Sequence, residues 1–254
     1  MNGTGKRQAL GRWLGPITLV ATLVTASASA GASPVSVHSP SVLARIRASV
    51  ARTERAGTAH FVTKVSASPL SRPGSVQHLT TVGDIQFSRP NVSLVTSVAS
   101  PSSTPSLKTA QIYLGKALYI RYLNPEGAPS SHWSHGVSGH FYPYLGAVEP
   151  AALVHAQGPV KTVGINVIDG HPATEYAVAV PAITDSLAVP GSKTQYIEVR
   201  PFILDVWLNR SGVIVCTSAT QIATGNGSIV SGRTVITLSG FGEPVHISAP
   251  VVSS

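Results

Sequence analysis

The chain has 254 residues, of which 43% are hydrophobic and only 11% are charged, and its net charge is +8. Such an apolar composition excludes an intrinsically disordered chain, and the shortage of charges excludes a bundle of charged, solvated helices. The basic residues are spread thinly and do not interleave with aromatic ones, so nucleic-acid binding is not indicated. Cys216 is the only cysteine, which excludes an intramolecular disulfide framework and a cysteine zinc site.

The first thirty residues have the three parts of a secretory signal peptide. Three basic residues precede the apolar stretch 14–25, and small residues at 26–30 supply A-x-A cleavage sites. We expect cleavage after Ala30, with Ala28 as the second choice, which would lower the net charge from +8 to +5. Because a lipoprotein signal ends in a cysteine, we expect an exported protein of the cell envelope or medium that carries no lipid anchor.

Residues 31–57 predict a tether followed by a helix. Residues 31–40 are rich in Ser and Pro, as flexible linkers are. Over 41–56, Val42, Ile46 and Val50 recur every four residues and Gly57 follows, which predicts an amphipathic helix. No linker interrupts 41–250, so we expect one domain there and a short tail at 251–254.

Short runs rich in Val, Thr, Ile and Tyr predict strands in most of the remaining chain. In the first half these runs are 60–68, 76–88, 92–99 and 107–123. A two-residue turn at Gly115-Lys116 would split the last run into a hairpin. That register places four apolar or aromatic residues on one face: Tyr113, Leu118, Ile120 and Tyr122.

The middle of the chain predicts a loop and two short helical segments. Residues 124–144 are rich in Gly, Pro and Ser, whereas 149–155 and 183–188 can form one or two helical turns. The loop holds His132, His135 and His140, which resemble an H-x-x-H metal motif. No carboxylate or cysteine completes that set, so we expect exposed histidines and no metal site.

The second half continues with hairpins. The runs 160–168 and 173–180 flank an Asp169-Gly170 turn, and 202–208 and 213–219 flank a turn at 209–212. With Arg210-Ser211 as the loop, one uncharged face of this hairpin consists of Val206, Leu208, Val213 and Val215. We expect Cys216 to be a buried, inert thiol in its strand. The last two strands are expected at 233–239 and 245–251. The fold class is therefore α+β and mostly antiparallel.

No motif indicates catalysis or a cofactor. A G-x-S-x-G elbow and the glycine-rich phosphate loops are absent from the sequence. The spacing of the ten carboxylates does not indicate a catalytic pair of acids. We therefore expect no catalytic residues and no cofactor.

Several short motifs of the second half follow one another in a recognisable order. They are Val163-Gly164, Val167-Ile168-Asp169-Gly170, Ala173-Thr174-Glu175-Tyr176, Asp205-Val206-Trp207-Leu208-Asn209, Gly212-Val213-Ile214 and Phe241-Gly242-Glu243-Pro244-Val245. This series resembles the actinobacterial LppX/LprG-type exported proteins, relatives of the LolA-type lipoprotein carriers, and the resemblance covers about 41–250. Two departures are the missing lipobox cysteine and Asn209, which stands where aspartate is usual.

The resemblance implies a curved antiparallel half-barrel closed by a few helices, with an apolar cavity for acyl chains. We therefore expect a non-enzymatic carrier of a lipid or acylated ligand, with transient membrane contact as an option. The cavity would be lined by the two uncharged faces: Tyr113, Leu118, Ile120, Tyr122, Val206, Leu208, Val213 and Val215. Two alternatives stay open, namely a sensory or protein-interaction domain of the same fold with a filled core and, third, a cell-envelope hydrolase.

Overall fold

The computed structural model describes residues 40–87, 91–100, 103–115, 117–123, 132–137, 153, 159–187, 195–225 and 228–252. The expected signal peptide and nearly all of the expected tether lie outside these residues, as does much of 124–158. The elements are α2 (Pro40–Arg55), β1 (Thr58–Pro69), β2 (Gln77–Gln86), β3 (Asn91–Ser100), β4 (Ser103–Leu114), β5 (Ala117–Leu123), β6 (Ser134–Val137), β7 (Val160–Ile168), β8 (His171–Val180), β9 (Ile183–Leu187), β10 (Gln195–Val199), β11 (Phe202–Leu208), β12 (Ile214–Gly225) and β13 (Ser228–Ser239).

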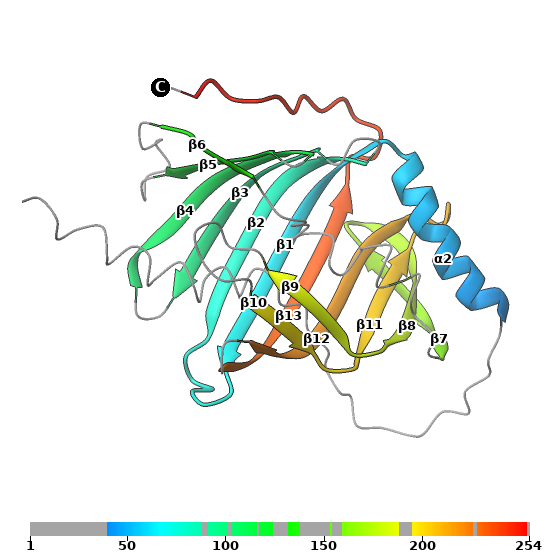
Figure 1. The fold of residues 1–254 in the computed structure, drawn as a ribbon. Coiled ribbons are helices and arrows are strands. Elements are labelled where there is room, and N and C mark those ends of the chain that lie inside the picture. The colour runs from blue at the N-terminus through cyan, green and yellow to red at the C-terminus, as the bar shows by residue number, and fades with distance from the viewer. Residues whose placement is uncertain are drawn as a thin grey trace, which may run out of the picture.

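All the described strands belong to one open sheet (Figure 1). Their order is β6-β5-β4-β3-β2-β1-β13-β12-β11-β8-β7, while β10 pairs with β12 and β9 pairs with β10. Every described pair is antiparallel. Figure 1 shows that the sheet bends without closing into a barrel. The predicted fold class, mostly antiparallel and half-barrel-like, is confirmed.

The predicted amphipathic helix is confirmed as α2. Pro40 occupies its first turn, where a missing N–H costs nothing, and Gly57 follows its end with φ +83°. Ile46 and Val50 are buried against the sheet, and Arg45 donates a hydrogen bond to the Tyr176 hydroxyl on β8 at 3.1 Å. Within the described residues, no helix is both long and apolar enough to cross a membrane. We call the face of the sheet that carries Tyr176 and its in-register neighbours the inner face, and the opposite one the outer face.

Two predicted hairpin turns are confirmed. Leu114 pairs with Ala117 around Gly115, which has φ +58°. Ile168 pairs with His171, and the intervening Asp169 and Gly170 both have positive φ. Positive φ at both central residues is the geometry that favours Asp-Gly in a two-residue turn.

Two glycines stand on the inner face because neighbouring strands approach too closely for a side chain. A Cβ on Gly83 of β2 would lie 2.2 Å from the carbonyl oxygen of Ser93 on β3. A Cβ on Gly232 of β13 would lie 2.8 Å from the Cβ of Ala67 on β1. Glycine inside a strand commonly marks such a close approach.

Two predicted elements are wrong. The segment expected to be helical at 183–188 contains strand β9, which pairs with β10 from Ile183↔Val199 to Leu187↔Gln195. Its β-branched Ile183 and Thr184 suit a strand once a partner is available. The strand expected at 245–251 does not form, because β13 already pairs with β1 and β12 on its two sides and offers no free edge.

The predicted middle loop is only partly correct. Residues 134–137 form β6, which pairs with β5 from Ala117↔Val137 to Ile120↔Ser134. Of the short helix expected at 149–155, the structure describes Leu153 alone, which is helical and buried. The other residues of that segment lie outside the described part.

Candidate functional site

The hairpin of β4 and β5 holds the first group of predicted site residues on the inner face. Tyr113 pairs with Leu118, and the register carries Ile120 and Tyr122 onto the same face. Tyr113 is buried, whereas Leu118, Ile120 and Tyr122 are half-buried. Burial raises the pKa of the Tyr122 hydroxyl above its ordinary value. The predicted register of this hairpin is therefore confirmed.

The second predicted group is only partly placed as expected. Val206 and Leu208 are buried on the inner face of β11, but Leu208 pairs with Ile214 and not with Val213. The prediction for Val213 is wrong because the turn holds three residues instead of two. The Asn209 N–H donates to the Val213 carbonyl at 3.0 Å, and Gly212 ends the loop with φ +74°.

Val215 follows at an irregularity of the strand. The register between β11 and β12 shifts from Leu208↔Ile214 to Trp207↔Cys216, so Val215 has no partner in β11. Such a β-bulge places one extra residue in one strand. Val215 instead lines a pocket of about 300 Å³ at this end of the sheet, together with Asn209 and Phe241. That volume is at the lower end of the range for small-molecule sites.

The first group and, of the second, Val206 and Leu208 lie on one continuous face but do not form one local cluster. Five strands of the sheet order, namely β3, β2, β1, β13 and β12, separate β4 from β11. Over β1–β5, β8 and β11–β13, the register places no charged residue on the inner face. The charged residues of these strands lie on the outer face: Lys64, Asp84, Lys108, Arg121, Glu175, Asp205 and Arg233.

A row of threonines, which sequence analysis missed, crosses the inner face. Thr63 on β1 pairs with Thr81 on β2, which pairs with Thr96 on β3, and Thr96 pairs with Thr109 on β4. We call these four residues the threonine row, and each is at most 9% exposed. The only sequence signal is a threonine at a buried position of each strand. Those positions align only once the long-range pairing is known.

The hydroxyls of the threonine row differ in their hydrogen bonds. Thr81 and Thr96 share a hydrogen bond of 3.1 Å. The Thr109 hydroxyl accepts one from the Gln111 amide at 3.1 Å, and Gln111 accepts one from the Tyr113 hydroxyl at 2.8 Å. The buried hydroxyl of Thr63 has no hydrogen-bond partner among the residues that the structure describes. Most buried polar atoms in proteins are paired, so this one requires an explanation.

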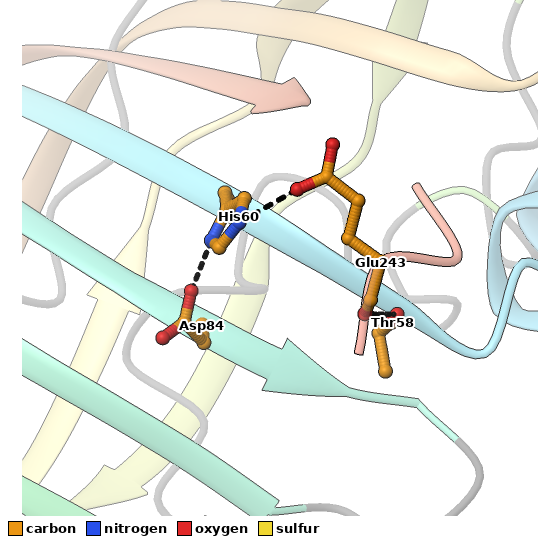
Figure 2. A network of polar contacts seen from close by, with 4 residues as sticks. All are labelled: Thr58, His60, Asp84 and Glu243. Atoms are coloured by element: carbon orange, nitrogen blue, oxygen red, sulfur yellow. Dashed lines mark hydrogen bonds and ion pairs between the residues drawn. The ribbon is translucent and has the colours of Figure 1, made fainter. Parts of the chain in front are cut away.

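A histidine on the outer face joins two carboxylates (Figure 2). His60 Nδ1 contacts Asp84, its partner on β2, and His60 Nε2 lies 3.3 Å from Glu243 Oε2. The hydrogen bond with Asp84, more than the contact with Glu243, raises the pKa of His60 above 6.5. Thr58 donates to the Glu243 carbonyl at 2.7 Å, so the cluster attaches the segment after β13 to β1. Because both ring nitrogens face carboxylates, this is not the arrangement of a serine hydrolase triad.

Two histidines of the predicted loop, His132 and His135, belong to the described residues. His135 on β6 packs its ring against Tyr119, with the ring centroids 4.9 Å apart, and the Arg121 guanidinium lies 4.6 Å from the centre of the Trp133 ring. His132 is exposed, and His140 lies outside the described residues. Across the part of the chain that the structure describes, no group of three His, Cys, Asp or Glu side chains could hold a metal ion.

Several solved structures have a similar architecture. The crystal structure of LprF from Mycobacterium bovis matches with a TM-score of 0.50 and 16% identity, over 84% of this chain and 98% of LprF. The chain has the fold of LprF. The lipoprotein LppX of Mycobacterium tuberculosis matches with a TM-score of 0.48 and 17% identity, over 82% of this chain and 99% of LppX. A LolA superfamily protein of Nitrosomonas europaea matches with a TM-score of 0.27 and 10% identity, over 76% of this chain and 91% of that one. No protein-family profile and no curated sequence matches the chain.

Proposed function

We propose that this protein is a non-enzymatic carrier that binds a lipid or an acylated ligand on the inner face of its sheet. The observation that supports this function is the absence of charge from that face over β1–β5, β8 and β11–β13. Burial of each methylene contributes about 0.8 kcal/mol, so a dozen carbons would contribute roughly 10 kcal/mol before the costs of binding. An uncharged face of this length is therefore sufficient for useful affinity without any polar motif.

The β5 end of the inner face is the region best suited to admit a ligand. Ile120 and Tyr122 on β5 are half-buried, whereas Tyr113 on the neighbouring β4 is buried. The proposed place of action is the cell envelope or the medium, in keeping with the basic, apolar and A-x-A order of 1–30.

A pair of lysine substitutions on opposite faces tests the proposal. Ile120→Lys introduces a charge on the inner face, whereas Val82→Lys introduces one on the outer face of β2, where Val82 is 52% exposed. With folding verified by thermal unfolding, we expect Ile120→Lys to abolish uptake of a fluorescent fatty acyl ester and Val82→Lys to leave it unchanged. Equal uptake by both variants would place the ligand elsewhere.

A protein-interaction domain with a filled core is the second candidate. It is favoured by the burial of Phe61, Leu79 and Leu94, each at most 3% exposed, in the central strands. A filled core predicts that the folded wild type, freed of co-purified lipid, takes up no acyl chain. Uptake at one molecule per chain would exclude this candidate.

A further inference from the structure

We infer that the threonine row is the position where the ligand's uncharged hydrogen-bond acceptors are held, which makes neutral acyl esters the preferred ligand class. This inference rests on the proposed carrier function and specifies its ligand. The geometry consists of four hydroxyl-bearing residues aligned across β1, β2, β3 and β4, at one level of an uncharged face.

On β1, apolar side chains flank the row on both sides, and on β3 an apolar side chain precedes it. Phe61 and Leu94 precede Thr63 and Thr96 by two residues, and Val65 follows Thr63 by two. A step of two residues along a strand is about 7 Å and returns to the same face. Phe61, Leu94 and Val65 are all buried. A ligand that lies along β1 therefore meets hydrocarbon on either side of the row.

Within the described part of the chain, no acceptor reaches the buried hydroxyl of Thr63. Its Oγ1 atom is buried without a hydrogen-bond partner, and Thr217 on β12, two strands away on the same face, is in the same condition. Burying a hydroxyl without a partner opposes folding. An ester carbonyl can accept from such a hydroxyl and brings no charge with it, so it would satisfy the atom that the protein leaves unsatisfied.

The electrostatics of the face argue against a charged head group at the row. The guanidinium of Arg45 reaches an inner-face side chain at Tyr176 on β8. Strands β11, β12 and β13 separate β8 from Thr63 on β1. A carboxylate or phosphate at the row would be desolvated without a described cation beside it, at a cost that a neutral ester avoids.

The test compares three probes of equal chain length: methyl palmitate, hexadecane and palmitate. Binding of each isotope-labelled probe would be measured by equilibrium partitioning on wild-type protein, Thr63→Val, Thr217→Val and the double variant. Valine keeps the shape of threonine and removes the unpaired hydroxyl, so the unfolding temperature should not fall. Thr80→Val, on the exposed outer side of β2, is the matched control.

We expect the wild type to bind methyl palmitate more tightly than hexadecane or palmitate. The double variant should lose about five- to tenfold in affinity for methyl palmitate and keep its affinity for hexadecane, as expected for losing one or two neutral hydrogen bonds. Equal binding of ester and alkane by the wild type, an unchanged ester preference in the variants, or tightest binding of palmitate would overturn the inference and leave the carrier function standing. Binding of none of the probes would overturn both.

Discussion

The hydroxyl of Thr53 on α2 accepts a hydrogen bond from the backbone N–H of Ile214 on β12 at 3.0 Å and donates one to the Ser49 carbonyl at 2.8 Å. Thr53 and Ile214 are both buried. The bond attaches the helix to the sheet at the residue beside the bulge, where Ile214 takes the inner position that pairs with Leu208.

Removing this hydroxyl should loosen the helix from the sheet. Thr53→Val leaves the buried N–H of Ile214 without a partner, which should lower the free energy of unfolding by about 1–3 kcal/mol. Thr53→Ser keeps the hydroxyl and should cost clearly less. Urea unfolding of the two variants measures the difference, and equal losses would mean that the methyl group, not the hydrogen bond, matters here.

Gly83 should tolerate no side chain. Gly83→Ala would force a Cβ against the Ser93 carbonyl, so we expect a loss of about 1–3 kcal/mol in the free energy of unfolding, as for other overpacked positions. Gly164→Ala on β7 is the control because its Cβ would meet no atom within 4 Å. If both alanine variants unfold at the same denaturant concentration, the close approach of β2 and β3 is not as described.

Cys216 should be chemically inert in the folded protein. It is buried on β12, and burial raises the pKa of its thiol to about 11, so almost no thiolate exists at neutral pH. Reaction with a thiol-specific disulfide reagent should be slow in the native protein and fast after denaturation. Since Cys216 is the only cysteine, one mole of reagent per chain reports on this site alone, and fast native labelling would contradict its burial.

Asp205 should make stability depend on pH. Burial first, and then the nearby Glu175 carboxylate, raises the pKa of Asp205 from 3.8 to about 6. The folded state therefore favours the protonated form, and this contribution to stability is complete below pH 3.8 and lost as the pH rises through about 6. Asp205→Asn should stabilise the protein at pH 7.5 by about 1 kcal/mol, since the half-exposed group is partly screened by solvent.

The pH dependence is checked by urea unfolding at two pH values. The gain from Asp205→Asn should be present at pH 7.5 and vanish near pH 4. A gain of equal size at both pH values would assign the effect to packing and not to the charge.

Features encoded by adjacent residues could be predicted from the sequence, whereas features that depend on distant strands could not. The helix α2 and the turns at Gly115 and Asp169-Gly170 follow from local periodicity and turn chemistry. The 209–212 turn admits two loop lengths, and the longer one removed Val213 from the predicted face.

The threonine row shows the same limit at longer range. Each threonine looks ordinary within its own strand, and 46 positions separate Thr63 from Thr109 in the chain. Similarly, β9 looked helical because the strand that stabilises it, β10, lies beyond a further segment of chain. Only the pairing of the strands shows which residues share a face.

Lipid binding on the inner face is tested most directly by extracting the purified, folded protein with organic solvent and identifying the extract by mass spectrometry. The expected result is an uncharged acyl lipid at close to one molecule per chain in the wild type, retained by Val82→Lys and lost from Ile120→Lys. The contradicting result is a folded wild type that yields no lipid and, after delipidation, takes up no acyl ester.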